Sequence, residues 1–287
     1  MALDRTALVF CSPPMAQVPL LARIEAVAAA GFDALSLQPG DVWALEAEGT
    51  SAAEIAARIA DAGLAVAEMD CTANWIARHE TTACGVPALE GLLRALPARR
   101  VVETAARIGA RSVAAIDMSA TVPGLDEAAE GFAALCDLAA EHGLLAHIEF
   151  LPVSAIRTLG EAAAIVAAAG RANGGLTIDA WHLFRSGSTL AELAAIPGER
   201  IHTVQLCDAP ATPAADLWAE LMTARLLPGE GALDLAGLVR TLDAIGANAP
   251  IGVEVFNARQ GDQAPGQVAR DWAEATRAVL AQARGQA

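Results

Sequence analysis

Apolar residues recur along the chain in eight short runs, and most of the runs end in polar residues or a turn. Each run is five to eight residues long. Several are almost continuously apolar, which is typical of parallel strands that are buried on both faces. The runs cover residues 7–12, 34–38, 65–71, 112–118, 144–151, 176–181, 201–207 and 251–256. The pattern predicts eight β-strands.

Helical spacing of apolar residues separates one run from the next, and glycines mark the expected helix ends. Glycine adopts the left-handed conformation at a helix C-terminus without steric cost. Such glycines precede the next run at 31, 63, 109, 143, 170, 198 and 246. At the other end, Ser51 with Glu54 predicts a capping box, and Thr158, Ser188 and Asp234 are expected N-caps. The last helix is expected over 265–284.

Eight alternating strand and helix units, with no break in composition, predict one (β/α)8 TIM barrel over residues 1–287. The alternative is an open doubly wound sheet. That fold needs a glycine-rich phosphate loop after its first strand, and the segment CSPPMAQVP found there has no glycine. The barrel is therefore favoured.

Two connections are longer than the others, over residues 72–94 and 209–233. Both follow the carboxyl end of a predicted strand, and in a barrel they lie on the catalytic face. Loops of this length are more often lids or binding elements than plain linkers. They carry Trp75, His79, Trp218 and Arg225.

Composition excludes several classes of protein. The net charge of −15 disfavours a nucleic-acid partner, because phosphate binding needs a basic surface. All 19 basic residues are arginine, so imine chemistry and a phosphate-binding lysine are absent. The five scattered cysteines favour a reducing compartment, and the N-terminal segment resembles neither a signal peptide nor a membrane anchor. We expect a cytoplasmic protein without a membrane partner, and a homo-oligomer is compatible with the sequence.

Four oxygen-bearing side chains stand at the ends of the last four predicted strands. They are Glu149, Asp179, Gln205 and Glu254. A carboxylate in so apolar a strand is costly unless it is paired or binds a metal. The carboxyl ends of neighbouring barrel strands meet at one mouth, and oxygen donors suit a hard divalent cation. The alternative is four separate buried polar residues, each satisfied on its own.

The segments IEF, IDAWH, VQLCDAP, RLLPGEGALDLAGL and VEVFN, in this order, resemble the sugar phosphate isomerase/epimerase superfamily, the xylose-isomerase-like TIM barrels. The resemblance covers the chain and is strongest over about 144–257. It implies one divalent metal, usually Mn²⁺, Mg²⁺ or Co²⁺, bound by Glu149, Asp179, Gln205 and Glu254. It also places His182 and Arg225 near the substrate.

Gln205 departs from the pattern, because many members of that superfamily have histidine at the matching position. An all-oxygen ligand set shifts the preference from Zn²⁺ towards Mn²⁺ or Mg²⁺. The VQ-x-x-DAP form with PGEG and ExFN is also similar to bacterial 3-dehydroshikimate dehydratases of the superfamily. The resemblance therefore implies either an isomerase or a lyase.

Other side chains carry weaker expectations. Arg225 and Arg157 could clamp substrate hydroxyls, a carboxylate or a phosphate. Asp208 is either a partner of a metal ligand or a loop cap. Glu68 and Asp70, with Trp75 and His79 of the following loop, could line the pocket, and their sequence positions assign no role to them.

The expected reaction is metal-assisted proton transfer next to a carbonyl in a small polyhydroxylated substrate. Glu149 and Glu254 would exchange protons on two sides of the carbon, which gives isomerisation or epimerisation. If a β-hydroxyl leaves instead, the site is a dehydratase, with His182 as the acid. An endonuclease-IV-like phosphodiesterase needs more histidines than the five present. A barrel without activity is the non-enzyme alternative.

Overall fold

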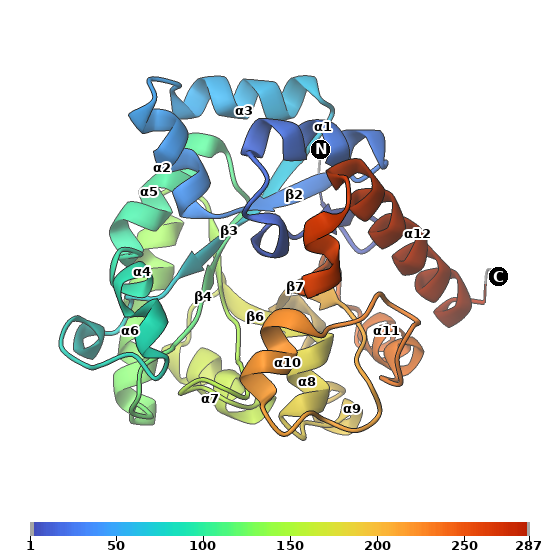
Figure 1. Cartoon of the computed structure of the whole chain (residues 1–287). Helices are drawn as coiled ribbons and strands as arrows, with labels where there is room; N and C mark the ends of the chain where they lie inside the picture. Colours follow the sequence, from blue (N-terminus) through green and yellow to red (C-terminus); the bar gives the residue numbers. More distant parts are fainter. Residues whose placement is uncertain (1–2, 286–287) are drawn as a thin grey trace.

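Eight parallel strands close into one barrel in the computed structural model, which describes residues 3–285 (Figure 1). Neighbours in sequence are neighbours in the sheet, and β1 pairs with both β2 and β8. The strands are β1 (Leu8–Phe10), β2 (Ala34–Leu37), β3 (Ala65–Thr72), β4 (Ser112–Ala115), β5 (Leu145–Ile148), β6 (Gly174–Asp179), β7 (Ile201–Leu206) and β8 (Ile251–Val253). The predicted (β/α)8 barrel is confirmed.

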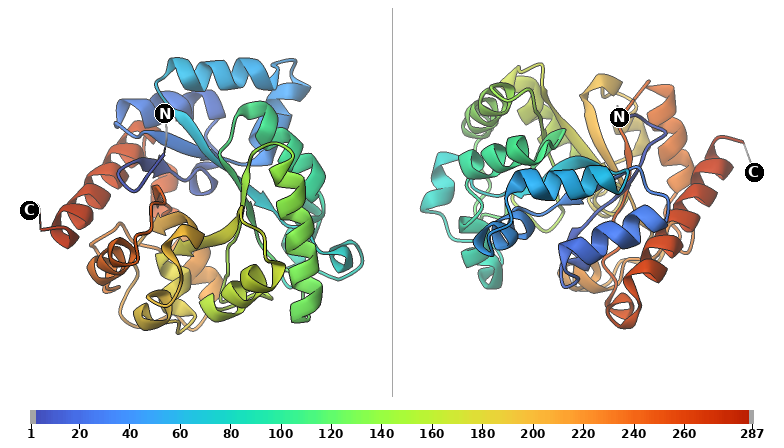
Figure 2. Two further views of the ribbon diagram at one scale, coloured as in Figure 1. Left: turned by 180° about the vertical axis from the view of Figure 1, so that it is seen from behind. Right: turned by 90° about the horizontal axis from the view of Figure 1, so that it is seen from above.

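Helices surround the barrel, as Figures 1 and 2 show. Between the first strands lie α1 (Leu20–Ala29), α2 (Pro39–Ala47), α3 (Ala52–Asp61), α4 (Glu90–Arg94), α5 (Ala98–Ile108) and α6 (Leu125–Ala140). The later ones are α7 (Leu159–Ala169), α8 (Ala180–Arg185), α9 (Leu190–Leu193), α10 (Leu217–Thr223), α11 (Leu235–Ala244) and α12 (Pro265–Ala283). The last helix, α12, packs against both α1 and α11 and so completes the outer layer.

The core is apolar between the sheet and the helices. The ring of Phe10 in β1 stacks on that of Trp272 in α12, with ring centroids 4.7 Å apart. Both side chains are almost fully buried, so this contact anchors the last helix to the first strand. Burying side chains of this size contributes roughly 1.5–3 kcal/mol each.

Most helix boundaries agree with the sequence. Ser51 and Thr158 form capping boxes, and Asp234 caps α11 through the backbone N–H of Gly237. The expectation for Ser188 is wrong, because the neighbouring Thr189 caps α9. The hydroxyl of Ser188 instead accepts a hydrogen bond from the backbone N–H that begins α7.

Six of the seven expected glycines do have positive φ. Gly198 does not, and it lies in a short 3₁₀ turn before β7. A Cβ atom there would come within 2.3 Å of the carbonyl oxygen of Ile245. Gly198 is therefore required by close backbone packing and not by a helix end.

Both long connections leave the carboxyl rim of the barrel, and each carries a short helix, α4 after β3 and α10 after β7. Residues of both helices line the cavity that the strand-end glutamates also reach, so their predicted place at the carboxyl ends of the strands is confirmed. Within the described part of the chain, no helix is both long enough and apolar enough to cross a bilayer.

Candidate metal centre

The four expected ligands lie at adjacent strand ends. Asp179 is the last residue of β6 and pairs in register with Gln205 of β7. Glu149 and Glu254 follow β5 and β8 by one residue, and their backbone N–H groups still bond to the neighbouring strands at 3.0 and 3.1 Å. All four side chains are buried. The sheet geometry thus brings together the residues that the sequence selected.

Arg225 reaches this cluster from the segment between α10 and α11. One guanidinium nitrogen donates to Asp179 Oδ2 at 2.9 Å and to Glu254 Oε2 at 3.2 Å. The guanidinium carbon lies 5.5 and 5.3 Å from the ring centroids of Trp181 and Phe256. Arg225 is almost fully buried, so it neutralises part of the carboxylate charge at the base of the cavity.

His182 contacts the cluster through both its backbone and its ring. Its backbone N–H donates to Asp179 Oδ1 at 2.8 Å, so that Asp179 is the N-cap of α8. Its ring Nε2 lies 3.2 Å from Glu149 Oε1, while Nδ1 is buried without a partner. A ring and a carboxyl at this distance share one proton, and either group can carry it.

Burial and neighbouring charges shift the pKa values of these groups. Burial, with the negative charges of Asp179 and Glu68, raises the pKa of Glu149 to about 8. Burial also raises the pKa values of Glu254 and Asp70 well above the usual range. In contrast, burial lowers the pKa of His182 to about 4. At neutral pH, in the absence of a cation, the shared proton therefore resides on Glu149 and not on His182.

The donor set fits a divalent cation. Three carboxylates and one amide stand buried at neighbouring strand ends, and Gln205 Oε1 is buried without a hydrogen-bond partner. Burial is the main cause of the raised pKa values of Glu149 and Glu254, and the negative charges of neighbouring carboxylates add to it. Within residues 3–285, no three His, Cys, Asp or Glu side chains are drawn together into a preformed metal cluster. Arg225, in contact with two of the carboxylates, occupies part of the volume between them.

Asp70 and Glu68, both in β3, have different environments. Asp70 lines the cavity with Glu149 and Glu254. Glu68 lies inside the barrel, where it accepts a hydrogen bond from Thr203 at 2.7 Å and lies 3.3 Å from His147. Glu68 therefore contributes negative potential from within the barrel, and Asp70 faces the cavity.

Two further candidates lie away from the cluster. Arg157 is exposed, and its Nε donates to the carbonyl of Ser154 at 3.1 Å, so the structure does not bring it to the cavity. Asp208 caps a loop by accepting backbone N–H bonds from Ala209, Gly229 and Leu233 at 2.8–3.1 Å. A Cβ atom at Gly231 would lie 2.2 Å from that carboxylate. The glycines of PGEG therefore accommodate Asp208.

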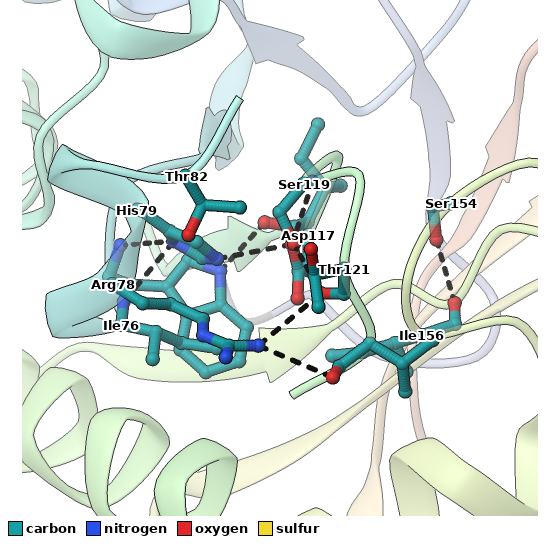
Figure 3. Close-up of polar contacts among 12 residues, drawn as sticks. Ile76, Arg78, His79, Thr82, Asp117, Ser119, Thr121, Ser154 and Ile156 are labelled. Atoms are coloured by element: carbon teal, nitrogen blue, oxygen red, sulfur yellow. Dashed lines mark hydrogen bonds and ion pairs between the residues drawn. The ribbon is translucent and has the colours of Figure 1, made fainter. Parts of the chain in front are cut away.

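His79 anchors the loop after β3, in which Trp75 also lies (Figure 3 labels His79). The ring of His79 accepts hydrogen bonds at Nδ1 from the backbone N–H groups of Trp75 and Ile76, both at 3.2 Å. Its Nε2 lies 3.1 Å from Asp117 Oδ1, in the connection after β4. Asp117 was not selected from the sequence. It ends an apolar run in the way that Asp179 does, so the rule used for Asp179 could have found it.

The comparisons with known proteins agree with this architecture. The chain is 31% identical over 165 residues to an inosose isomerase of Bacillus velezensis, and the match spans 55% of this chain and 58% of the isomerase. It is 36% identical over 102 residues to a 3-dehydroshikimate dehydratase of Pseudomonas aeruginosa, spanning 36% of this chain and 16% of the dehydratase. The chain thus covers little more than half of the first relative.

A crystal structure of an IolI protein with a bound zinc atom superposes with a TM-score of 0.83 at 20% sequence identity. The superposition covers 96% of this chain and 98% of that one, and it shows the fold. The sequence profile of one family matches residues 24–281, which is most of the chain. The protein belongs to the Xylose isomerase-like TIM barrel family.

Proposed function

We propose that this chain is a divalent-metal-dependent isomerase or epimerase that moves a proton at the carbon next to the carbonyl of a small hydroxy-ketone. The observation that carries the proposal is the pair of buried glutamates, Glu149 and Glu254, that reach one oxygen-donor site from β5 and β8. The similarity to an inosose isomerase supports it.

Asp179, Gln205, Glu149 and Glu254 would hold the metal, with Mn²⁺ or Mg²⁺ favoured over Co²⁺ or Zn²⁺ because every donor is oxygen. When bound, the cation supplies a Lewis acid that polarises a carbonyl and lowers the pKa of its neighbouring C–H. Arg225 would orient the substrate oxygens, because a buried guanidinium donates in a fixed plane.

The two glutamates carry the proton. One carboxylate removes it from the carbon, and the other returns one from its own side of the cavity. The pair formed by Glu149 and His182 stores a proton, because Glu149 Oε1 and the ring Nε2 are 3.2 Å apart. With no lysine in the chain, an imine route is absent.

The second candidate is a lyase of the 3-dehydroshikimate dehydratase type. The observation that favours it is the 36% identity over 102 residues to such an enzyme. The same proton abstraction would begin that reaction, and a β-hydroxyl would leave instead of a proton returning. Dehydration adds a C=C bond in conjugation with the carbonyl and raises the ultraviolet absorbance, whereas isomerisation leaves the conjugation unchanged, so a spectrophotometer distinguishes the two.

Proton exchange with solvent tests the proposal. Protein loaded with Mn²⁺ is incubated in D₂O with hydroxyacetone, with an inosose and with 3-dehydroshikimate, and NMR follows deuterium at the carbon next to the carbonyl. We expect exchange that is lost in Glu149→Gln and Glu254→Gln. If the wild-type protein exchanges no proton with any of the three ketones but hydrolyses a phosphodiester, the proposal is refuted.

A further inference from the structure

A cavity of about 680 Å³ opens above the candidate metal centre. Glu149, His182, Arg225 and Glu254 form one end of it, together with Asp70. Binding sites of about 300–1,000 Å³ are typical of drug-sized ligands. The cavity therefore has room for a molecule much larger than a hydroxy-ketone group alone.

Away from this charged end, most of the lining is apolar, with Gln38, Asp41 and Glu48 as the exceptions. Eight leucines line the cavity, at positions 20, 45, 89, 92, 93, 96, 151 and 221. Trp218, Met222 and Phe256 are also among its walls. Such side chains favour the apolar parts of a ligand over its hydroxyl groups. Removing a hydroxyl group from water without a new hydrogen-bond partner costs free energy.

The charges in the cavity also disfavour an anionic ligand. Of the described residues that line it, Arg225 is the only cation, and it already pairs with Asp179 and Glu254. The acidic residues Asp41 and Glu48 lie on the wall formed by α2 and the residue that follows it. A phosphate or carboxylate at the far end of a ligand would meet no positive partner there.

The wall formed by α10 is held in place by a buried carboxylate. Glu220 Oε1 accepts hydrogen bonds from Trp181 Nε1 at 2.9 Å and from Arg185 Nε at 2.6 Å. Both partners belong to α8, which begins at the metal centre. The apolar face of α10, with Trp218 and Leu221, is thereby fixed over the cavity.

The opposite wall is held in a similar way. Arg94 of α4 donates to the carbonyls of His79, Glu80 and Thr82 at 2.7–3.0 Å. His79 in turn joins this loop to Asp117, as Figure 3 shows. These contacts hold the leucines of α4 at the mouth of the cavity, where Leu92 is 59% exposed. Met222 of the α10 wall is 37% exposed, so the mouth itself presents apolar surface.

We infer that the substrate is amphipathic: a hydroxy-ketone head at the metal end carries an uncharged apolar body, aromatic or aliphatic, of six or more carbons. The hydroxy-ketone head of this substrate is inferred from the proposed function, whereas its apolar body is inferred from the residues that line the cavity. Phosphorylated and fully hydroxylated ketones should bind more weakly than such a substrate, because neither matches the leucine-rich walls.

Three probes with one head and different bodies test this inference. Hydroxyacetone, 2-hydroxyacetophenone and dihydroxyacetone phosphate are titrated into the Mn²⁺-loaded protein, and binding is followed by tryptophan fluorescence and by calorimetry. We expect 2-hydroxyacetophenone to bind about tenfold or more tighter than the other two, with a more negative heat-capacity change. Equal affinities, or a preference for the phosphate, overturn the inference.

A matched pair of variants locates the apolar contact. Met222→Lys places a charge at the cavity wall, and we expect the preference for the phenyl probe to fall towards one, whereas Met222→Leu keeps it. Leu125→Lys changes a residue that is 50% exposed outside the cavity, and the preference should stay unchanged. An unaltered preference in Met222→Lys would contradict the inference.

Binding and exchange separate this inference from the proposed function. The phenyl preference without deuterium exchange in any probe would refute the proposed reaction and leave the apolar site standing. Deuterium exchange of hydroxyacetone, with no tighter binding of the phenyl probe, would refute the apolar site and leave the proposed reaction standing.

Discussion

Gln205 is the only one of the four expected ligands that is not a carboxylate, and its Oε1 is buried without a partner. A histidine there would add a nitrogen donor, which suits zinc better. We predict that Gln205→His raises the ratio of zinc to manganese retained after dialysis against equal amounts of both, and that Gln205→Leu retains less of either. Elemental analysis measures both. Gln267→Leu, on α12 away from the cavity, serves as the control.

Glu149 makes the metal-free protein sensitive to pH. Its pKa rises from an ordinary value of 4.5 to about 8 in the fold. The folded protein therefore binds more protons than the unfolded chain between these values, and its stability falls as pH rises through that range. We predict that Glu149→Gln removes part of this slope, at about 1.4 kcal/mol per pKa unit at most.

Denaturant unfolding at pH 5 and pH 8, after chelation, checks this prediction. The variant should equal or exceed the wild-type stability at pH 8 and should still fail to hold metal. Identical slopes in the two proteins would show that Glu149 does not carry the retained proton.

Arg225 neutralises Asp179 and Glu254 in the buried cluster. Its removal leaves two carboxylates without a counter-charge, which costs about 3–5 kcal/mol in buried pairs. We predict that Arg225→Met lowers the melting temperature of the metal-free protein strongly, and that Mn²⁺ raises it more than in the wild type. Arg259→Met, at an exposed position, is the control. Unchanged stability without metal would mean that the contact is unimportant.

At the scale of elements, the loop between β3 and α5 depends on one buried side chain. His79 accepts two backbone N–H bonds and contacts Asp117 across the neighbouring connection. An unsatisfied buried donor costs about 1–3 kcal/mol. We predict that His79→Ala exposes residues 77–95 to faster proteolysis and hydrogen exchange, with a smaller effect on the barrel strands.

Mass spectrometry of protected amides measures the effect segment by segment. His142→Ala, at an exposed site after α6, should leave the exchange pattern unchanged. Equal acceleration in the strands and in the loop would contradict a local role for His79.

The elements that the sequence missed are short and lie at the carboxyl rim. The run expected over 112–118 gives a strand only over Ser112–Ala115, because the chain leaves the sheet there to form the rim. Helix α8 begins directly at Asp179, and α4 and α10 lie inside loops. Apolar periodicity is weak over so few residues, which is why it detects long helices better.

At the scale of the whole molecule, the predicted metal would tie together half of the barrel. The four predicted ligands stand on or directly after β5, β6, β7 and β8. A ligand that binds only the folded state adds about 2.7 kcal/mol of stability at one hundred times its Kd. We predict that a chelator lowers the melting temperature of the whole protein, and that Mn²⁺ restores it.

Differential scanning calorimetry measures this shift, and Asp179→Asn should abolish it. A melting temperature that is independent of chelator in the wild type would exclude a tightly held metal at this site.

Sequence reasoning reached the barrel and the position of four polar residues at adjacent strand ends, because both depend on strand order. The ends of parallel strands meet wherever the loops run. It did not find that Arg225 pairs with Asp179, nor that leucines of α4 and α10 share one cavity. The first contact joins residues 46 apart in the chain, and the two helices are more than one hundred residues apart, so no local pattern encodes either. Arg157 is a further example. It is close to Glu149 in the sequence, but its side chain bonds to the carbonyl of Ser154 and does not line the cavity.

The two walls of the cavity and its charged end come from different kinds of segment. The acids stand on or directly after strands that the barrel needs for its closure, whereas α4 and α10 belong to connections that it does not need. Evolution could therefore exchange the walls independently of the acidic groups, provided that Arg225, which lies in the second connection, is kept. Grafting the two connections onto a relative should transfer the choice of substrate and preserve the reaction. In this family, new substrates would then arise by loop replacement on an inherited chemistry.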